Sequence, residues 1–317
     1  MSIKTKNSIL AIILAATPLF LLAATPEGTI TELSSRYNGQ LLMKEGEILL
    51  VKSNGKKLYF IEPELREYNN LVSGRPAAYI EKIVYHTTAT PTPNNLRFPV
   101  KDTDYGTYYI ADKDLGKFES DLPPHLAYPG SVLQIVYRKD DTYIGYLTEL
   151  FRTPFVIMPK RTKAGKNQAD LHMGSDCASF AIYGMRRMGF DYPYIGPQRI
   201  YQFLRSLYPS ILRPIERKGT IAYYDAGGDS PNGGSMPQPG DILHFGEQVT
   251  VFYQDAGVIG MLDSDDLIIH STILQPEITT IRKSAFNKHA LRIFRWKKSD
   301  KSDSSDRSDR SDKEDPK

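Results

Sequence analysis

The chain has 317 residues, enough for about two domains of roughly 150 residues each. Its hydrophobic content of 40% and charged content of 24% are typical of a globular protein, which excludes wholesale disorder, collagen-like chains and multispan membrane proteins. The formal net charge of +3 is too small for the electrostatic footprint of a nucleic-acid-binding protein. Cys177 is the one cysteine, so an intramolecular disulfide or a zinc site with several cysteines is impossible.

Residues 1–24 have the pattern of a secretory signal peptide. Lys4 and Lys6 provide the positive start, and a mostly apolar run over residues 9–24 ends in small residues. This run is shorter than the roughly 20 residues that a membrane-spanning helix needs, which favours a cleaved signal peptide. The alternative is that the segment stays attached as an anchor helix. We therefore expect an exported protein, periplasmic or secreted, with no stable membrane span after signal removal. No cysteine lies near the cleavage region, which excludes a lipoprotein anchor.

Residues 27–150 predict a small β-rich accessory domain, either a sandwich or a barrel. Glu47–Lys52 and Lys57–Ile61 flank an Asn-Gly pair and predict a hairpin. Further strands are expected at residues 78–85, 106–110, 131–137 and 142–146. The many tyrosines are expected to pack in the sheets, with a sugar-stacking face as the alternative. His125 follows two prolines and is expected in a loop.

Residues 151–298 predict an α+β domain. Apolar residues at helical spacing predict a helix over Asp176–Met188, ending at Gly189, and a second helix over Gln198–Leu207. Residues 209–239 are loop-like, and four strands are expected at residues 241–245, 249–253, 267–270 and 291–296. Residues 299–317 consist mostly of Ser, Asp, Lys and Arg and predict a disordered charged tail.

Cys177 is the candidate nucleophile, because it lies at the start of a predicted helix. Unpaired N–H groups at a helix N-terminus stabilise a thiolate and can hold the oxyanion of a tetrahedral intermediate. A nucleophilic cysteine also needs a base, and His244 and His270 lie on strands predicted downstream. The alternative is that Cys177 is a small buried hydrophobe and that both histidines are ordinary strand residues. His172 and His289 are expected at the surface.

The order of these segments resembles the NlpC-type family of papain-like cell-wall cysteine peptidases over about residues 174–298. The family's Asp-Cys-Ser-Gly at a helix start is matched by Asp-Cys-Ala-Ser at residues 176–179. Its Gly-Asp-Leu motif is matched by Gly240-Asp241-Ile242, and its apolar pair followed by His is matched at residues 268–270. The resemblance implies a papain-like fold, with helices packed on an antiparallel sheet after the small β-rich domain.

The sequence departs from the family where the general-base histidine is expected, because Gln248 stands there. Glutamine cannot accept a proton from a thiol. His270 matches the family's third, orienting residue, so we expect His270 to be the partner of Cys177, assisted by His244. Gln248 would then orient the imidazole or donate a hydrogen bond to the oxyanion.

Two classes of function remain open. The first is an exported cysteine amidase or peptidase, which by resemblance acts on peptidoglycan stem peptides or on another amide or ester. It would need no metal or organic cofactor, and an acyltransferase would use the same parts. The second is a degenerate binding or structural module of the cell envelope. The sequence indicates neither an oligomeric state nor a nucleic-acid partner.

Overall fold

The computed structural model describes residues 39–52, 57–66, 82–90, 95–99, 101 and 103–297. The predicted signal peptide and charged tail lie outside these residues. Across the described ranges, no helix combines the length and the apolar character needed to cross a membrane.

The first half of the chain is built on a six-stranded sheet with the order β1-β8-β6-β3-β4-β7. Neighbouring strands are antiparallel, except that β1 runs parallel to β8. The strands are β1 (Gln40–Lys44), β3 (Tyr59–Pro63), β4 (Ile83–Ala89), β6 (Gly106–Ala111), β7 (Lys117–Ser120) and β8 (Val132–Arg138). β6 and β8 match the predicted strands, as expected from their aromatic and β-branched residues.

The predicted hairpin around the Asn-Gly pair is wrong. β2 (Leu49–Lys52) pairs with β5 (Asn95–Phe98), whereas β3 pairs with β4 and β6. Strands that are adjacent in sequence therefore belong to different sheets. A local turn signal was overridden by long-range packing, in which Leu49 and Val51 are buried in the same cluster as Phe98.

The second half contains a six-stranded antiparallel sheet with the order β15-β14-β13-β12-β16-β9. All four strands predicted after residue 240 are present, and β15 and β9 were not predicted. A separate hairpin, β10–β11, occupies part of the region expected to be loop. The strands are β9 (Leu204–Ser206), β10 (Arg213–Arg217), β11 (Thr220–Tyr224), β12 (Ile242–His244), β13 (Val249–Gln254), β14 (Leu267–Thr272), β15 (Gln275–Thr280) and β16 (Arg292–Trp296).

The α-helices of the described ranges are α2 (Pro124–Ala127), α3 (Tyr143–Thr148) and α4 (Cys177–Arg187). α4 confirms the predicted helix. The strand predicted over residues 142–146 is wrong, because the Thr142 side chain accepts from the N–H of Gly145 and caps α3. The predicted helix Gln198–Leu207 is also wrong: a 3₁₀ helix covers Pro197–Phe203, and the chain then enters β9. Short 3₁₀ helices also cover Gly233–Ser235 and Ile281–Lys283.

The predicted fold class, a papain-like α+β domain with helices packed on an antiparallel sheet, is therefore wrong. The structure is mainly β, with several sheets, and the α-helices of its described ranges are 4, 6 and 11 residues long. The reason is a long-range pairing: of the two helices expected in the second half, only α4 forms, because residues 204–206 pair with β16 instead. The domain boundary near residue 150 stays a prediction.

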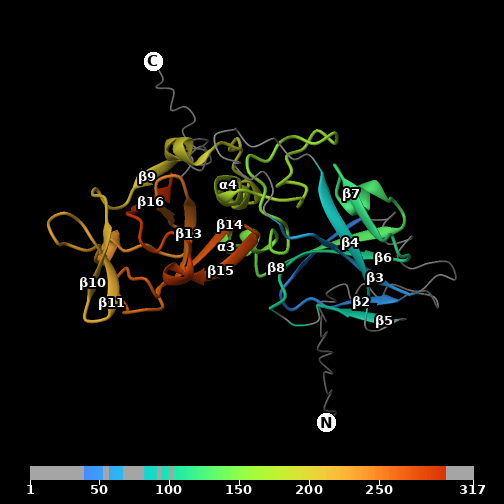
Figure 1. Cartoon of the computed structure of the whole chain (residues 1–317), viewed down its shortest axis with the longest axis horizontal. Helices are drawn as coiled ribbons and strands as arrows, with labels where there is room; N and C mark the ends of the chain where they lie inside the picture. The colour runs from blue at the N-terminus through green and yellow to red at the C-terminus, as the bar shows by residue number, and fades with distance from the viewer. Residues whose placement is uncertain are drawn as a thin grey trace, which may run out of the picture.

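Figure 1 shows α3 and α4 between the two large sheets, and both helices contact strands. Gly184 of α4 lets α3 approach closely, because a Cβ there would lie 2.6 Å from the Tyr143 ring and 2.8 Å from Leu147. The Tyr143 hydroxyl also donates to the carbonyl of Ala181 at 3.0 Å.

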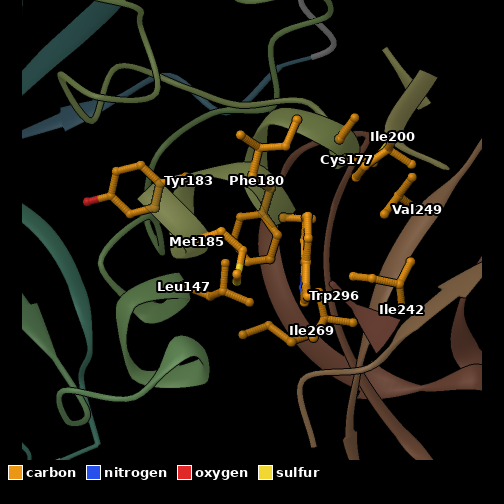
Figure 2. Close-up of a cluster of buried hydrophobic side chains, with 14 of the residues drawn as sticks. Leu147, Cys177, Phe180, Tyr183, Met185, Ile200, Ile242, Val249, Ile269 and Trp296 are labelled. Atoms are coloured by element: carbon orange, nitrogen blue, oxygen red, sulfur yellow. The ribbon is translucent and has the colours of Figure 1, made fainter. Parts of the chain in front are cut away.

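A cluster of buried side chains joins α4 to one face of the second sheet (Figure 2). Val249, Val251 and Ile269 belong to this cluster together with the buried residues of α4. Figure 2 shows Cys177 beside Val249 and Ile200. The strand residues next to these, including Phe252 and Ile268, pack in a separate cluster. Because successive strand residues point to opposite faces, these two clusters define the two faces of the sheet. Burying one such large side chain contributes about 1.5–3 kcal/mol.

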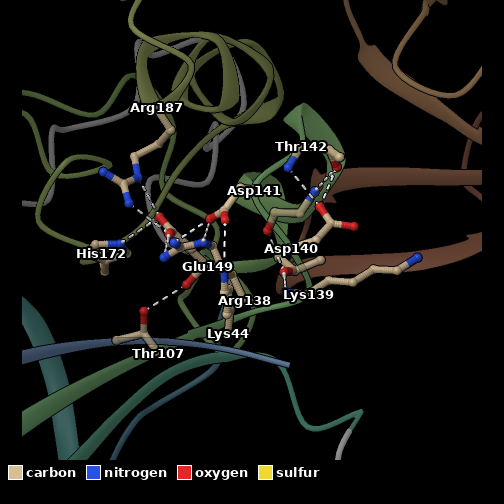
Figure 3. Close-up of polar contacts among 12 residues, drawn as sticks. Lys44, Thr107, Arg138, Lys139, Asp140, Asp141, Thr142, Glu149, His172 and Arg187 are labelled. Atoms are coloured by element: carbon tan, nitrogen blue, oxygen red, sulfur yellow. Dashed lines mark hydrogen bonds and ion pairs between the residues drawn. The ribbon is translucent and has the colours of Figure 1, made fainter. Parts of the chain in front are cut away.

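A buried carboxylate links the two halves of the chain (Figure 3). Glu149, which follows α3, is fully buried and accepts hydrogen bonds from Arg187 Nε at 2.8 Å and Nη2 at 3.0 Å. Arg138 of β8 lies 3.3 Å from the same carboxylate, and the Tyr183 hydroxyl donates to it. Burial raises the pKa of Glu149, but His172 and Arg187 outweigh it and hold the pKa at about 2. Glu149 is therefore ionised and paired at neutral pH.

Candidate functional site

The start of α4 is fixed by side-chain hydrogen bonds. The Asp176 carboxylate accepts from the N–H of Ser179 at 2.7 Å, and the Ser179 hydroxyl accepts from the N–H of Asp176 at 2.9 Å, forming a capping box. Gly174 precedes the cap with φ +146°, and a Cβ there would lie 2.5 Å from Val156 Cγ2. The Ser271 hydroxyl of β14 donates to the Ser175 carbonyl at 2.9 Å. These contacts place Cys177 at the first helical position, against the second sheet.

The Cys177 thiol is buried and lacks an imidazole contact in the described structure. The side chain is 6% exposed, and its Sγ donates a weak hydrogen bond to the Glu247 carbonyl at 3.9 Å. Burial, together with the nearby Asp176 carboxylate, raises the pKa of Cys177 to about 12. Backbone N–H groups of Val249 and Ala178 lower it, but by less. The thiol is therefore protonated at neutral pH.

His270 lies on the face of the sheet opposite Cys177. Its strand neighbour Ile269 packs with α4, whereas His270 makes an edge-on ring contact with Phe286 in the opposite cluster, at 5.5 Å. Its Nδ1 lies 2.9 Å from the Thr272 hydroxyl, and its Nε2 lies 3.8 Å from the Glu277 carboxylate without forming a hydrogen bond. Burial lowers the pKa of His270 to about 4. The structure does not bring this imidazole to the thiol.

His244 is on the same face as α4, but both of its ring nitrogens have other partners. Nε2 lies 3.0 Å from the Pro197 carbonyl, which can only accept, so Nε2 carries the proton. Nδ1 then accepts from the Tyr201 hydroxyl at 2.8 Å, and the two rings lie 4.4 Å apart. Burial lowers the pKa of His244. The side chain is thereby tied to the 3₁₀ helix.

Gln248 connects to His270 through a hydroxyl. Its Nε2 donates to the Thr272 Oγ1 at 2.9 Å, and Thr272 also contacts the His270 ring. A longer contact joins Gln248 Nε2 to the Ser271 carbonyl at 3.4 Å. The structure therefore brings together two of the four predicted site residues, Gln248 and His270, near the end of the sheet where β13 begins and β14 ends. Their proposed roles in catalysis, and that of Cys177, stay predictions.

The Gly-Asp motif has a structural role in this fold. The Asp241 carboxylate is almost fully buried and receives two hydrogen bonds from the Arg295 guanidinium, both at 2.7 Å. It also accepts from the N–H of Gln238 at 2.7 Å. The bidentate pair fastens the start of β12 to β16.

Sequence reasoning missed several buried polar groups on both sides of the boundary near residue 150. His172 and His125, expected at the surface and in a loop, are each only 6% exposed, whereas His289 is exposed as predicted. Glu149 had no assigned role. One signal was present: Glu149 and His172 are each flanked by large apolar residues, at 147–151 and 171–173. Among the described residues, no group of three or more His, Cys, Asp or Glu is placed to hold a metal ion.

Comparison of the chain with protein-family models, with curated proteins and with solved structures found no match.

Proposed function

We propose that this chain is an exported module of the cell envelope that binds its partner without hydrolysing it. The observation that carries this proposal is the state of Cys177: the thiol is buried, its pKa is about 12, and neither candidate histidine contacts it. A nucleophilic cysteine needs a thiolate and a base within hydrogen-bond reach, and the site provides neither. Export is supported by the signal-peptide pattern, and a peptidoglycan partner by the order of the motifs.

The structural roles of the motif residues support the same proposal. Asp176 caps α4, Asp241 holds Arg295, and Gln248 joins β13 to β14. Each of these contacts contributes to packing without any substrate. The structural contacts of these motif residues therefore do not require a catalytic thiol.

A cysteine amidase or peptidase is the second candidate, and one observation favours it. Backbone N–H groups of Val249 and Ala178 act on the Cys177 sulfur, and such groups could also hold an oxyanion. An acyltransferase would use the same N–H groups. Either activity would require a rearrangement that brings a base to the thiol and exposes it.

The test uses insoluble peptidoglycan and three proteins: the mature wild type, Cys177→Ala and Gln248→His. We expect wild type and Cys177→Ala to cosediment equally with peptidoglycan and to release no soluble peptide. Gln248→His restores the histidine that the resembled family has at this position, and it should not create hydrolysis because the thiol stays buried. Cys177-dependent release of fragments by the wild type would establish the amidase instead. Failure to cosediment would contradict the binding role.

A further inference from the structure

Residues 158–168 form a positively charged hairpin, here named the basic hairpin. It carries Lys160, Arg161, Lys163 and Lys166 and has no acidic residue. Its charge of +4 exceeds the +3 of the whole chain, so the rest of the protein is nearly neutral. All four side chains are exposed.

The hairpin is held in one conformation by its own hydrogen bonds. Arg161 and Asn167 form a β-bridge, and the N–H of Thr162 donates to the Lys166 carbonyl at 2.8 Å. The Asn167 side chain donates to the Pro159 carbonyl at 3.0 Å. The cations are therefore presented by an ordered backbone, and less ordering entropy is lost when a partner binds.

The base of the hairpin is attached to the start of α4. The N–H of Met158 donates to the Asp176 carboxylate at 3.1 Å. Met158 has φ +53°, a conformation that is uncommon for a residue other than glycine, and its side chain is 71% exposed. An exposed apolar side chain in a strained conformation, beside a cationic hairpin, points to an interaction.

Two of the cations are available to a partner. Lys163 is paired with Asp121 at 2.6 Å. Within the described residues, Arg161 and Lys166 take part in no ion pair or side-chain hydrogen bond. Their charge is therefore not neutralised by the fold.

We propose that the basic hairpin docks the protein on a membrane surface that contains anionic phospholipid. Arg161 and Lys166 attract the phosphate groups of the lipids, and Met158 enters the boundary between headgroups and acyl chains. Met158 distinguishes this partner from a soluble polyanion, which would use the cations alone. The proposal goes beyond the binding function above and does not depend on it, because Cys177 and peptidoglycan take no part in it.

The experiment measures cosedimentation of the mature protein with vesicles of phosphatidylcholine, with and without phosphatidylglycerol. The test variant is Arg161→Gln/Lys166→Gln. The control is Lys283→Gln/Lys288→Gln, which removes the same charge from other exposed sites. Met158→Asn tests the apolar contact, since asparagine tolerates a positive φ.

We expect wild type to bind only the vesicles with phosphatidylglycerol, and less strongly as salt increases. Each cation near an anionic surface contributes about fivefold in affinity, the equivalent of about 1 kcal/mol, so the test variant should bind about 25-fold more weakly. The control should bind nearly as well as wild type, and Met158→Asn more weakly. Three outcomes would each overturn the proposal: no binding by wild type, equal losses in test and control variants, or full binding by Met158→Asn.

Discussion

Glu149→Gln should be among the most damaging single substitutions in this protein. The change keeps the shape of the side chain but removes the charge that Arg187 and Arg138 share across the two halves. The pKa of Glu149 is about 2, compared with 4.5 for an ordinary glutamate, which corresponds to about 3 kcal/mol of stability at neutral pH. Breaking a buried ion pair typically costs 3–5 kcal/mol, so we expect a loss of about 3–5 kcal/mol.

Chemical denaturation followed by the fluorescence of Trp296, the one tryptophan, measures this loss. Asp141→Asn is the matched control, because Asp141 contacts the same Arg138 but is half exposed, and exposed pairs contribute about 0–1 kcal/mol. A depressed carboxyl pKa stabilises fully above the unfolded pKa, and this stabilisation is lost progressively as the pH falls toward the folded pKa. The difference between wild type and Glu149→Gln should therefore shrink as the pH falls from 4.5 toward 2. A loss below about 1 kcal/mol at pH 7 would refute the assigned role of Glu149.

Three further predictions concern the second half of the chain. Asp241→Asn should cost about 2–3 kcal/mol in the free energy of unfolding, because it breaks the bidentate pair with Arg295; equal denaturation midpoints would refute this. Asp176→Ala should cost about 1–2 kcal/mol by removing the cap of α4, whereas an unchanged free energy of unfolding would mean that the cap does not stabilise the helix. The pKa of His270 is lowered from 6.5 to about 4, so the unfolded chain binds a proton where the folded chain does not, and stability should fall as the pH drops through that window. His270→Gln should flatten this part of the stability profile, and an identical profile would contradict the burial of the imidazole.

Sequence patterns correctly predicted the helices and strands whose formation depends mainly on residues close together in the chain. α4 forms where helical periodicity, the Asp176 cap and Gly189 agree, and β13 and β14 form where apolar and β-branched residues dominate. The failures have a different cause. β2 pairs with β5 and not with β3, its neighbour in sequence. Residues 204–206 form a strand because they pair with β16. Such choices depend on segments that are far apart in the chain.

The candidate site shows the same limit. Motif order correctly placed Cys177 at a helix start and His270 on a strand of the adjoining sheet. It could not give the face of the sheet to which the imidazole points, because that depends on the register between β13 and β14, and one residue of shift reverses it. The ion pairs of Glu149 could likewise not be predicted from the sequence, because Arg138 and Arg187 come from separate segments of the chain.

The rate of alkylation of Cys177 by iodoacetamide as a function of pH, followed by intact mass, tests the non-hydrolytic role most directly. We predict that the folded protein reacts far more slowly than free cysteine at pH 7–8, because the thiol is buried and its pKa is about 12. The denatured protein should react at the rate of an ordinary thiol. Rapid alkylation of the folded protein at neutral pH, with a thiol pKa below the ordinary value of about 8.5, would contradict the proposal and favour a catalytic cysteine.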